Sequence, residues 1–316
     1  MNNILICTLI SFLMILTPAL ASEIDSFTHR YDTSLKDSQK IIHLKANQFL
    51  NEALKLANAE NKGCSEAVLY KNLRHFFKNH MKGKLTPFII HSPKVSKYVM
   101  NFKDSIYRDF KWYDAFSIIF IQTIYKNMAG PILRMGPYYI GADKFEHMFG
   151  RGWKYFEKYY LKNNSLLKVM EFGHRSERIY LGANTTGVYS FADLSANFNG
   201  MRFWNDMLGK HADILGEKFQ VKPYVRCDEN KQWIQNNQIN FLHYIDDSFD
   251  EAINCSEFRN QKILTKVLNQ IDSLERDKGL RFTCPLALNS IEYLEIKYQE
   301  IEKHILNFKG HTTLSK

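Results

Sequence analysis

The chain has 316 residues, of which 45% are hydrophobic and 24% charged, and its formal net charge is +9. This length can bury the core of one large domain or two small ones. The basic excess suits an anionic partner such as phospholipid or lipopolysaccharide, but a Lys-rich solvated surface is the simpler explanation. We expect no nucleic-acid partner, because the first segment indicates export.

The N-terminus has the pattern of a secretory signal peptide. Residues 4–16 are almost all apolar, Thr17-Pro18 follows, and Ala19-Leu20-Ala21 forms a small-x-small cleavage site. The apolar run is short for a membrane span. Ser22, rather than a cysteine, follows the site, which argues against a lipoprotein. We therefore expect residues 1–21 to be removed after Ala21, leaving a periplasmic or secreted protein.

Four cysteines remain in the expected mature chain: Cys64, Cys227, Cys255 and Cys284. An even number in an exported protein favours two disulfides, for which three connectivities exist. Three of the four lie in the last third of the chain, so two bridges require that Cys64 joins that third. The thiols lack CxxC spacing, which argues against a metal role for them.

Hydrophobic periodicity predicts mainly helices in the first half of the chain. The expected helices cover residues 34–59 and 65–81, which a short glycine-containing turn would make an antiparallel pair. Residues 84–93 contain two prolines and are expected to be extended or a loop. The very apolar residues 112–128 predict a buried central helix, with a membrane-dipping helix as the alternative.

The second half is also predicted to be helical, with one hairpin. Helices are expected at 143–162, 166–180, 190–208, 241–252, 261–277 and 291–308, and the hairpin within 219–234. The predicted fold is mainly α, a compact helical bundle with a short β-hairpin and a disulfide-clipped C-terminal helical region. We expect an N-terminal helical region at 22–110, core helices at 111–216, and the hairpin with C-terminal helices at 217–316.

Residues 141–204 contain two polar pairs at helical spacing. Asp143 and His147 lie four residues apart, as do Asp193 and Asn197, and this spacing places each pair on one helix face. Glu177 lies between the pairs. Helix capping alone explains Asp143 and Asp193, since each fits a variant of the capping box. Capping does not explain His147, Asn197 or Glu177, so we expect a buried polar site there.

Three chemistries fit this expected site. Asp143, His147, Glu177 and Asp193 could hold a divalent ion such as Zn, Mn or Mg that activates water. Alternatively, His147 acts as a general base without a metal, held by Glu177 or Asp143. A nucleophile at Ser190 or Ser176 is the third option, although no Gly-x-Ser-x-Gly elbow supports it.

Other polar groups have smaller expected roles. Lys144, Ser190 and Asn197 are candidate binding residues beside the site. His174 is a further acid–base candidate. The acidic run at residues 246–251 is predicted to be a solvated helix face, because it lacks the glycine and the spacing of a calcium loop.

The order of these motifs resembles that of VanZ-like proteins and of a related small periplasmic lipoprotein family of unknown function. The shared series is Asp143-Lys144-x-x-His147, Glu177, Ser190-x-x-Asp193 and Asn197-x-x-Gly200, within residues 141–208. The resemblance implies an envelope protein, and VanZ itself is associated with glycopeptide resistance. VanZ-like proteins have several membrane spans and often carry Gln where this chain has Tyr180.

The predicted function is therefore that of an exported cell-envelope protein with a buried, hydrolase-like polar site, with or without a metal. Its expected substrate is an envelope component such as lipid, lipopolysaccharide or peptidoglycan, and peripheral membrane contact is compatible with the basic charge. The alternative is a non-catalytic envelope protein whose Asp, His, Glu and Asn cluster is a structural network or a ligand-binding pocket.

Overall fold

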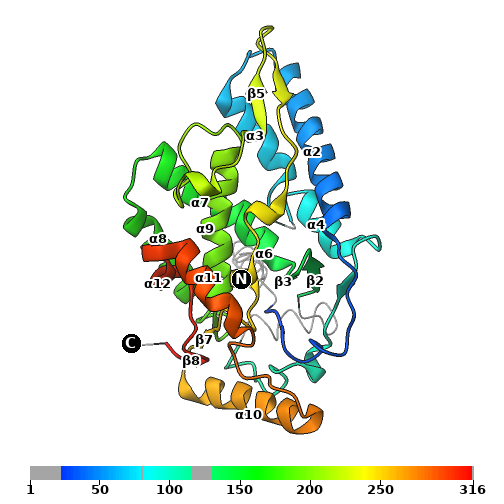
Figure 1. Cartoon of the computed structure of the whole chain (residues 1–316), viewed down its shortest axis with the longest axis vertical. Helices are drawn as coiled ribbons and strands as arrows, with labels where there is room; N and C mark the ends of the chain where they lie inside the picture. Colours follow the sequence, from blue (N-terminus) through cyan, green and yellow to red (C-terminus); the bar gives the residue numbers. More distant parts are fainter. Residues whose placement is uncertain (1–22, 80, 116–129, 315–316) are drawn as a thin grey trace, which may run out of the picture.

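A computed structural model describes residues 23–79, 81–115 and 130–314, and it confirms a mainly helical fold (Figure 1). The predicted signal peptide and most of the predicted helix at 112–128 lie outside these residues. Among the described helices, none has the length and apolar character needed to cross a membrane.

The N-terminal region contains the two expected helices and one that was not expected. Helices α2 (Gln39–Ala59) and α3 (Glu66–Phe76) lie side by side (Figure 1). The prediction of an extended segment at 84–93 is wrong, because α4 spans Leu85–His91. Pro87 is the third residue of α4, and a first-turn amide has no helical partner to lose.

A small antiparallel sheet leads into the polar motifs. Strand β1 (Lys97–Tyr98) pairs with β2 (Ile132–Met135), and β2 pairs with β3 (Tyr138–Gly141). Met135 faces Tyr138 across the two-residue turn, in which Gly136 has a φ of 61° that favours glycine. The strand β3 ends directly before the first helix of the motif region.

The motif region is formed by three helical stretches, the last of which is the central helix α9. The first runs from Asp143 to Leu161 as α6 (Asp143–Glu146), the π-turn η2 (His147–Arg151), α7 (Gly152–Phe156) and the π-turn η3 (Glu157–Leu161). The second is α8 (Leu166–Ser176), extended by the π-turn η4 (Glu177–Leu181). The third, α9 (Phe191–Asp206), runs through the middle of the molecule and is buried from Ala192 to Asp206 (Figure 1).

Two glycines allow the first stretch to cross α9 closely. A Cβ on Gly200 would lie 2.1 Å from the carbonyl oxygen of Met148, and one on Gly152 would lie 2.5 Å from the Gly200 Cα. Both distances are shorter than any real Cβ contact, so only glycine fits at this crossing. The close approach brings the side chains of η2 and α9 together.

The C-terminal third differs from its prediction in two places. The helix predicted at 241–252 is wrong, because this segment forms the 3-10 turns η6 (Phe241–His243) and η7 (Asp247–Phe249). The Asn240 and Asp246 side chains each accept a hydrogen bond from a backbone amide two residues later, which favours turns over a continuous helix. The last predicted helix is interrupted at Gln299, whose φ is 47°.

The remaining elements are one long helix, short helices and short strands. Helix α10 (Gln261–Lys278) matches its prediction. The single helix predicted at 291–308 is replaced by α11 (Leu288–Tyr298), η8 (Gln299–Ile301) and α12 (Glu302–Ile305). The predicted hairpin is β5 (Val225–Cys227) with β6 (Trp233–Gln235). Strands β4 (Val188–Tyr189), β7 (Glu257–Phe258) and β8 (Thr312–Thr313) form a second small sheet, and η1 (Phe102–Asp104) and η5 (Glu217–Phe219) are single 3-10 turns.

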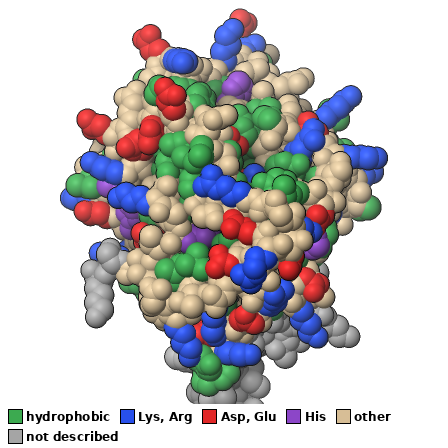
Figure 2. Space-filling view, turned by 60° about the horizontal axis from the view of Figure 1, so that its bottom comes forward, with side chains coloured by type: hydrophobic (Ala, Val, Ile, Leu, Met, Phe, Trp, Pro, Cys, Tyr) green, Lys and Arg blue, Asp and Glu red, His purple; other side chains and the backbone are tan. Residues whose placement is uncertain are grey.

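Both expected disulfides are present. Cys64 bonds Cys227, which clips the β5–β6 hairpin to the turn between α2 and α3, and Cys255 bonds Cys284. The pairing confirms that Cys64 joins the C-terminal third. On the face shown in Figure 2, Lys and Arg side chains are spread among acidic ones over much of the surface.

Candidate functional site

Lys144 lies at the centre of three carboxylates. Its Nζ donates to Asp143 Oδ2 at 2.8 Å, to Asp193 Oδ1 at 2.7 Å and to Glu251 Oε1 at 2.6 Å. The Lys144 side chain is fully buried. Lys144 comes from α6, Asp193 from the first turn of α9, and Glu251 from the turn after η7. The ammonium therefore occupies the position that a metal would take among these three acids.

The charges of this group determine its protonation. Burial alone would lower the pKa of Lys144, but Asp143, Asp193 and Glu251 outweigh it and raise that pKa well above its ordinary value. Burial raises the pKa of Glu251 to about 7, and Lys144 opposes that rise. Burial also raises the pKa of Asp143. Lys144 is therefore a permanent cation, and Glu251 exchanges its proton near neutral pH.

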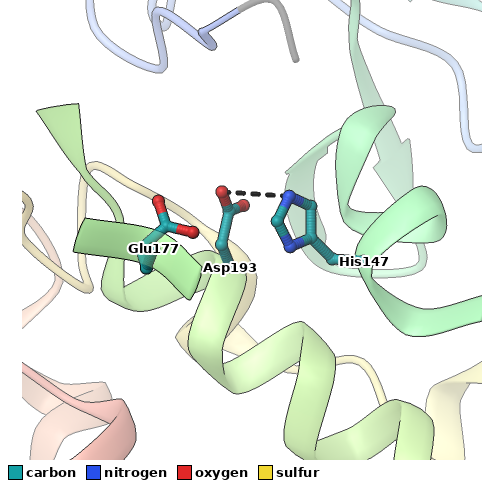
Figure 3. A group of neighbouring side chains, drawn as sticks. All are labelled: His147, Glu177 and Asp193. Atoms are coloured by element: carbon teal, nitrogen blue, oxygen red, sulfur yellow. Dashed lines mark ion pairs between the residues drawn. The ribbon is translucent and has the colours of Figure 1, made fainter. Parts of the chain in front are cut away.

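A second group, His147, Glu177 and Asp193, shares Asp193 with the first. His147 Nε2 lies 3.1 Å from Asp193 Oδ2, and one ligand atom from each of the three residues lies within 4.8 Å of the others. Figure 3 shows Asp193 between the other two, with the Glu177 carboxylate on one side and the imidazole on the other. All three side chains are buried.

Asn197 determines how the imidazole is protonated. His147 Nδ1 lies 3.1 Å from Asn197 Oδ1 in the assigned amide orientation. Because Oδ1 can only accept, Nδ1 carries a hydrogen, and in a neutral ring the lone pair is then on Nε2. Nε2 faces the Asp193 carboxylate, so two acceptors would meet at 3.1 Å. A proton or another cation must therefore lie between them.

Glu177 provides a third acceptor that lacks a donor. Its Oε1 accepts a hydrogen bond from the Ser190 amide at 3.3 Å, while Oε2 is buried and has no hydrogen-bond partner among the described residues. Burial, followed by the negative charge of Asp193, raises the pKa of Glu177 well above its usual value. A buried carboxylate in this position either holds a proton or faces a cation.

The structure gives Ser190 and Asp143 specific partners. Ser190 caps α9 as expected, since its Oγ accepts from the Asp193 amide at 3.2 Å, and it donates to Glu251 at 3.1 Å. The Asp143 side chain does not cap α6, whose N-cap is Ala142. Among the described residues, the hydrogen bonds of His147 go to Asp193 and Asn197 and not to a serine hydroxyl.

His174 lies in a separate pair. Its Nδ1 contacts the Tyr189 hydroxyl, and its Nε2 lies 3.3 Å from His304 Nδ1. Burial, with a smaller effect from His304, lowers the pKa of His174 to about 4.

Two acids near the site, Glu251 and Glu23, were not identified from the sequence. Glu251 belongs to the acidic run at 246–251. This run is not a solvated helix face, because Asp246, Asp250 and Glu251 are each at most 3% exposed. Asp246 pairs with Lys297 at 2.5 Å and Asp250 with Arg30 at 2.7 Å. The apolar neighbours Ile245, Phe249, Ala252 and Ile253 were a signal of burial.

Glu23 is the second missed acid. Burial raises the pKa of its carboxyl well above the usual value, and the charges of Glu251 and Asp193 raise it further, which places Glu23 in the electrostatic field of the cluster. It follows the expected cleavage site by two residues, so sequence patterns did not connect it with the motifs.

Comparisons of the chain with protein-family models, with curated proteins and with solved structures found no match. The resemblance to VanZ-like proteins thus rests on the motifs alone.

Proposed function

We propose that this chain is an exported cell-envelope protein in which His147, Glu177 and Asp193 bind a divalent cation and hydrolyse an envelope component. One observation carries the proposal: His147 Nε2, Asp193 Oδ2 and the Glu177 carboxylate, whose Oε2 has no hydrogen-bond partner, converge without a donor between them among the described residues. One imidazole and two carboxylates suit Zn, Mn or Mg.

The neighbouring side chains support this role. Asn197 accepts from His147 Nδ1, which is the outer contact that orients a metal-ligating imidazole. Lys144 binds one oxygen of Asp193 and leaves the other directed at His147. A divalent ion bound here would supply Lewis-acid activation of water.

The location and substrate class are supported by the sequence and the disulfides. The signal-peptide pattern and two disulfides fit an oxidising compartment such as the periplasm. The basic charge and the motif resemblance favour an envelope substrate such as lipid, lipopolysaccharide or peptidoglycan.

A second candidate is a non-catalytic ion network. The observation that favours it is the complete burial of Lys144 against three carboxylates, an arrangement that stabilises a fold without any ligand. In this case a proton on His147 Nε2 replaces the metal, and the imidazolium donates to both Asp193 and Asn197.

The two candidates are separated by Glu177→Gln. Glutamine imitates the shape of the protonated acid, so thermal stability without metal is expected to stay close to that of the wild type. Affinity for Zn or Mn, measured by calorimetry and by metal content after purification, is expected to fall about tenfold or more. Glu171→Gln, the same change at an exposed position on the preceding helix α8, is the control and should leave affinity unchanged.

The metal proposal is wrong if the wild-type protein binds no Zn, Mn or Mg at micromolar concentrations. If neither the wild type nor Glu177→Gln binds a divalent ion, the ion network is the function that the cluster supports instead.

A further inference from the structure

We propose that Trp112 and Tyr113, with the basic side chains around them, form a surface that binds anionic phospholipid membranes. This aromatic–basic surface consists of Arg108, Lys111, Trp112, Tyr113, Arg259, Lys262 and Lys266. None of these residues belongs to the polar cluster, so the inference does not depend on the metal proposal.

Trp112 is unusually exposed for a tryptophan of this chain, and the neighbouring Tyr113 is exposed as well. Trp112 is 67% and Tyr113 50% exposed, whereas the other three tryptophans, Trp153, Trp204 and Trp233, are at most 8% exposed. The two rings contact each other edge to face, with centres 5.6 Å apart, and still leave apolar area exposed to water. Trp and Tyr are the residues enriched at membrane–water interfaces, where an apolar ring and a polar edge are both satisfied.

Basic groups from α10 surround the same ring. Lys262 Nζ lies 4.8 Å from the centre of the Tyr113 ring, and Lys266 Nζ lies 5.8 Å from it. Arg259 donates to the Tyr113 carbonyl at 2.8 Å. These contacts hold the Trp112–Tyr113 segment against the start of α10, so aromatic and cationic groups form one surface.

The charge balance of this surface favours an anionic partner. The surface has five basic residues, and its first segment also contains two acids, Asp109 and Asp114, so the net charge is +3 (5 − 2). Asp114 is buried and neutralised by Lys266 at 2.5 Å, so it contributes little outward field. Figure 2 turns the α10 end forward and shows Lys and Arg side chains beside hydrophobic ones toward the lower edge of this face.

Two weak attractions predict reversible peripheral binding. The basic residues are attracted to an anionic leaflet. Partial insertion of the exposed Trp112 side chain adds to this by removing apolar area from water. Because Debye screening weakens the first contribution, binding is expected to fall as salt rises. Vesicles of neutral lipid should therefore bind much less well than anionic ones.

Trp112 itself is the reporter for the test. Since the other tryptophans are buried, a blue shift of tryptophan fluorescence on adding vesicles reports the environment of Trp112. The mature, disulfide-bonded protein is mixed with vesicles of phosphatidylglycerol and phosphatidylcholine, or of phosphatidylcholine alone. We expect a blue shift and cosedimentation with the first and little of either with the second.

The variants identify the surface. Trp112→Ala and Lys262→Glu should each weaken cosedimentation with anionic vesicles by about tenfold. Tyr180→Ala removes an exposed aromatic ring and Lys168→Glu reverses an exposed charge outside the surface, and both variants should bind like the wild type. Trp112→Phe should keep most binding while it abolishes the fluorescence shift. Glu177→Gln should bind vesicles normally, which separates this surface from the polar cluster.

The proposal is overturned if the wild type shows neither a shift nor cosedimentation with anionic vesicles. It is also overturned if the control variants lose as much binding as Trp112→Ala and Lys262→Glu, because general surface charge would then be the cause.

Discussion

Replacing Lys144 with methionine tests how strongly the buried ammonium stabilises the fold. Methionine keeps a long apolar side chain and removes the charge. The three carboxylates that Lys144 Nζ contacts at 2.6–2.8 Å then face one another without a cation. The change therefore turns a network of one cation and three carboxylates into one of carboxylates alone.

The expected loss can be bounded from these contacts. A hydrogen bond to a charged group contributes about 1.5–3 kcal/mol, so three such bonds give a gross loss of roughly 5–9 kcal/mol. Protonation limits this loss, because Glu251 and Asp143 already have raised pKa values and take up protons readily once the ammonium is gone. Breaking a buried ion pair typically costs about 3–5 kcal/mol, and we expect a loss in that range at neutral pH.

The pH dependence has a definite sign. A carboxyl group whose folded-state pKa lies above its unfolded value destabilises the fold as pH rises between those two values. Without Lys144, Asp143 and Glu251 lose the positive charge that opposes the rise in their pKa, so this range moves toward higher pH. The variant should therefore lose more stability at pH 8 than at pH 5, measured against the wild type at each pH.

Urea unfolding with both disulfides intact measures this difference. Lys154→Met is the matched control, because Lys154 pairs with Glu157 at 2.8 Å but its side chain is 48% exposed. That exposed pair should contribute less than about 1 kcal/mol at either pH. The reasoning is refuted if Lys144→Met costs no more than the control, or if its cost is the same at both pH values.

Three further changes test the fold. Gly200→Ala should cost about 3 kcal/mol in urea unfolding through overpacking, whereas Gly150→Ala, with no atom within 4 Å of the new Cβ, should be neutral or slightly stabilising. Replacing Cys64 and Cys227 with serine should cost about 3–5 kcal/mol, because that bridge spans 163 residues. The pKa of His174 is lowered to about 4, so as pH falls from 6.5 to 4 the unfolded state binds a proton that the folded state does not, and the fold is destabilised. His174→Gln should reduce this acid destabilisation by about 1–2 kcal/mol, measured by thermal unfolding at several pH values.

Helices with clear hydrophobic periodicity or with local signals at their ends could be predicted. Ser190 caps α9 where the sequence indicated, and Asn260 and Gly279 bound α10. The prediction failed at α4, where proline was counted against a helix although its place in the first turn carries no cost. It failed again at 241–252, where side chains of Asn240 and Asp246 bind nearby amides and stabilise turns.

The site was predictable only where its contacts follow local spacing. His147 and Asp193 were each marked by a polar neighbour one helical turn away, and the structure brings them together across the close crossing at Gly200. Glu251 lies 107 residues from Lys144, in a run that resembled a solvated helix face. A contact at that separation depends on tertiary packing, which no periodicity encodes.

Asp193 belongs both to the ion network around Lys144 and to the proposed cation site at His147, so the two depend on each other. One of its oxygens accepts from the fully buried Lys144 ammonium, and the other faces His147. The contact with the ammonium fixes the direction of the second oxygen of Asp193. That oxygen is the acceptor that either a proton on His147 or a metal ion requires as a partner. The ion network therefore prepares the site that a cation would occupy, and a variant that removes Lys144 should weaken cation binding at His147 even though Lys144 does not contact that cation.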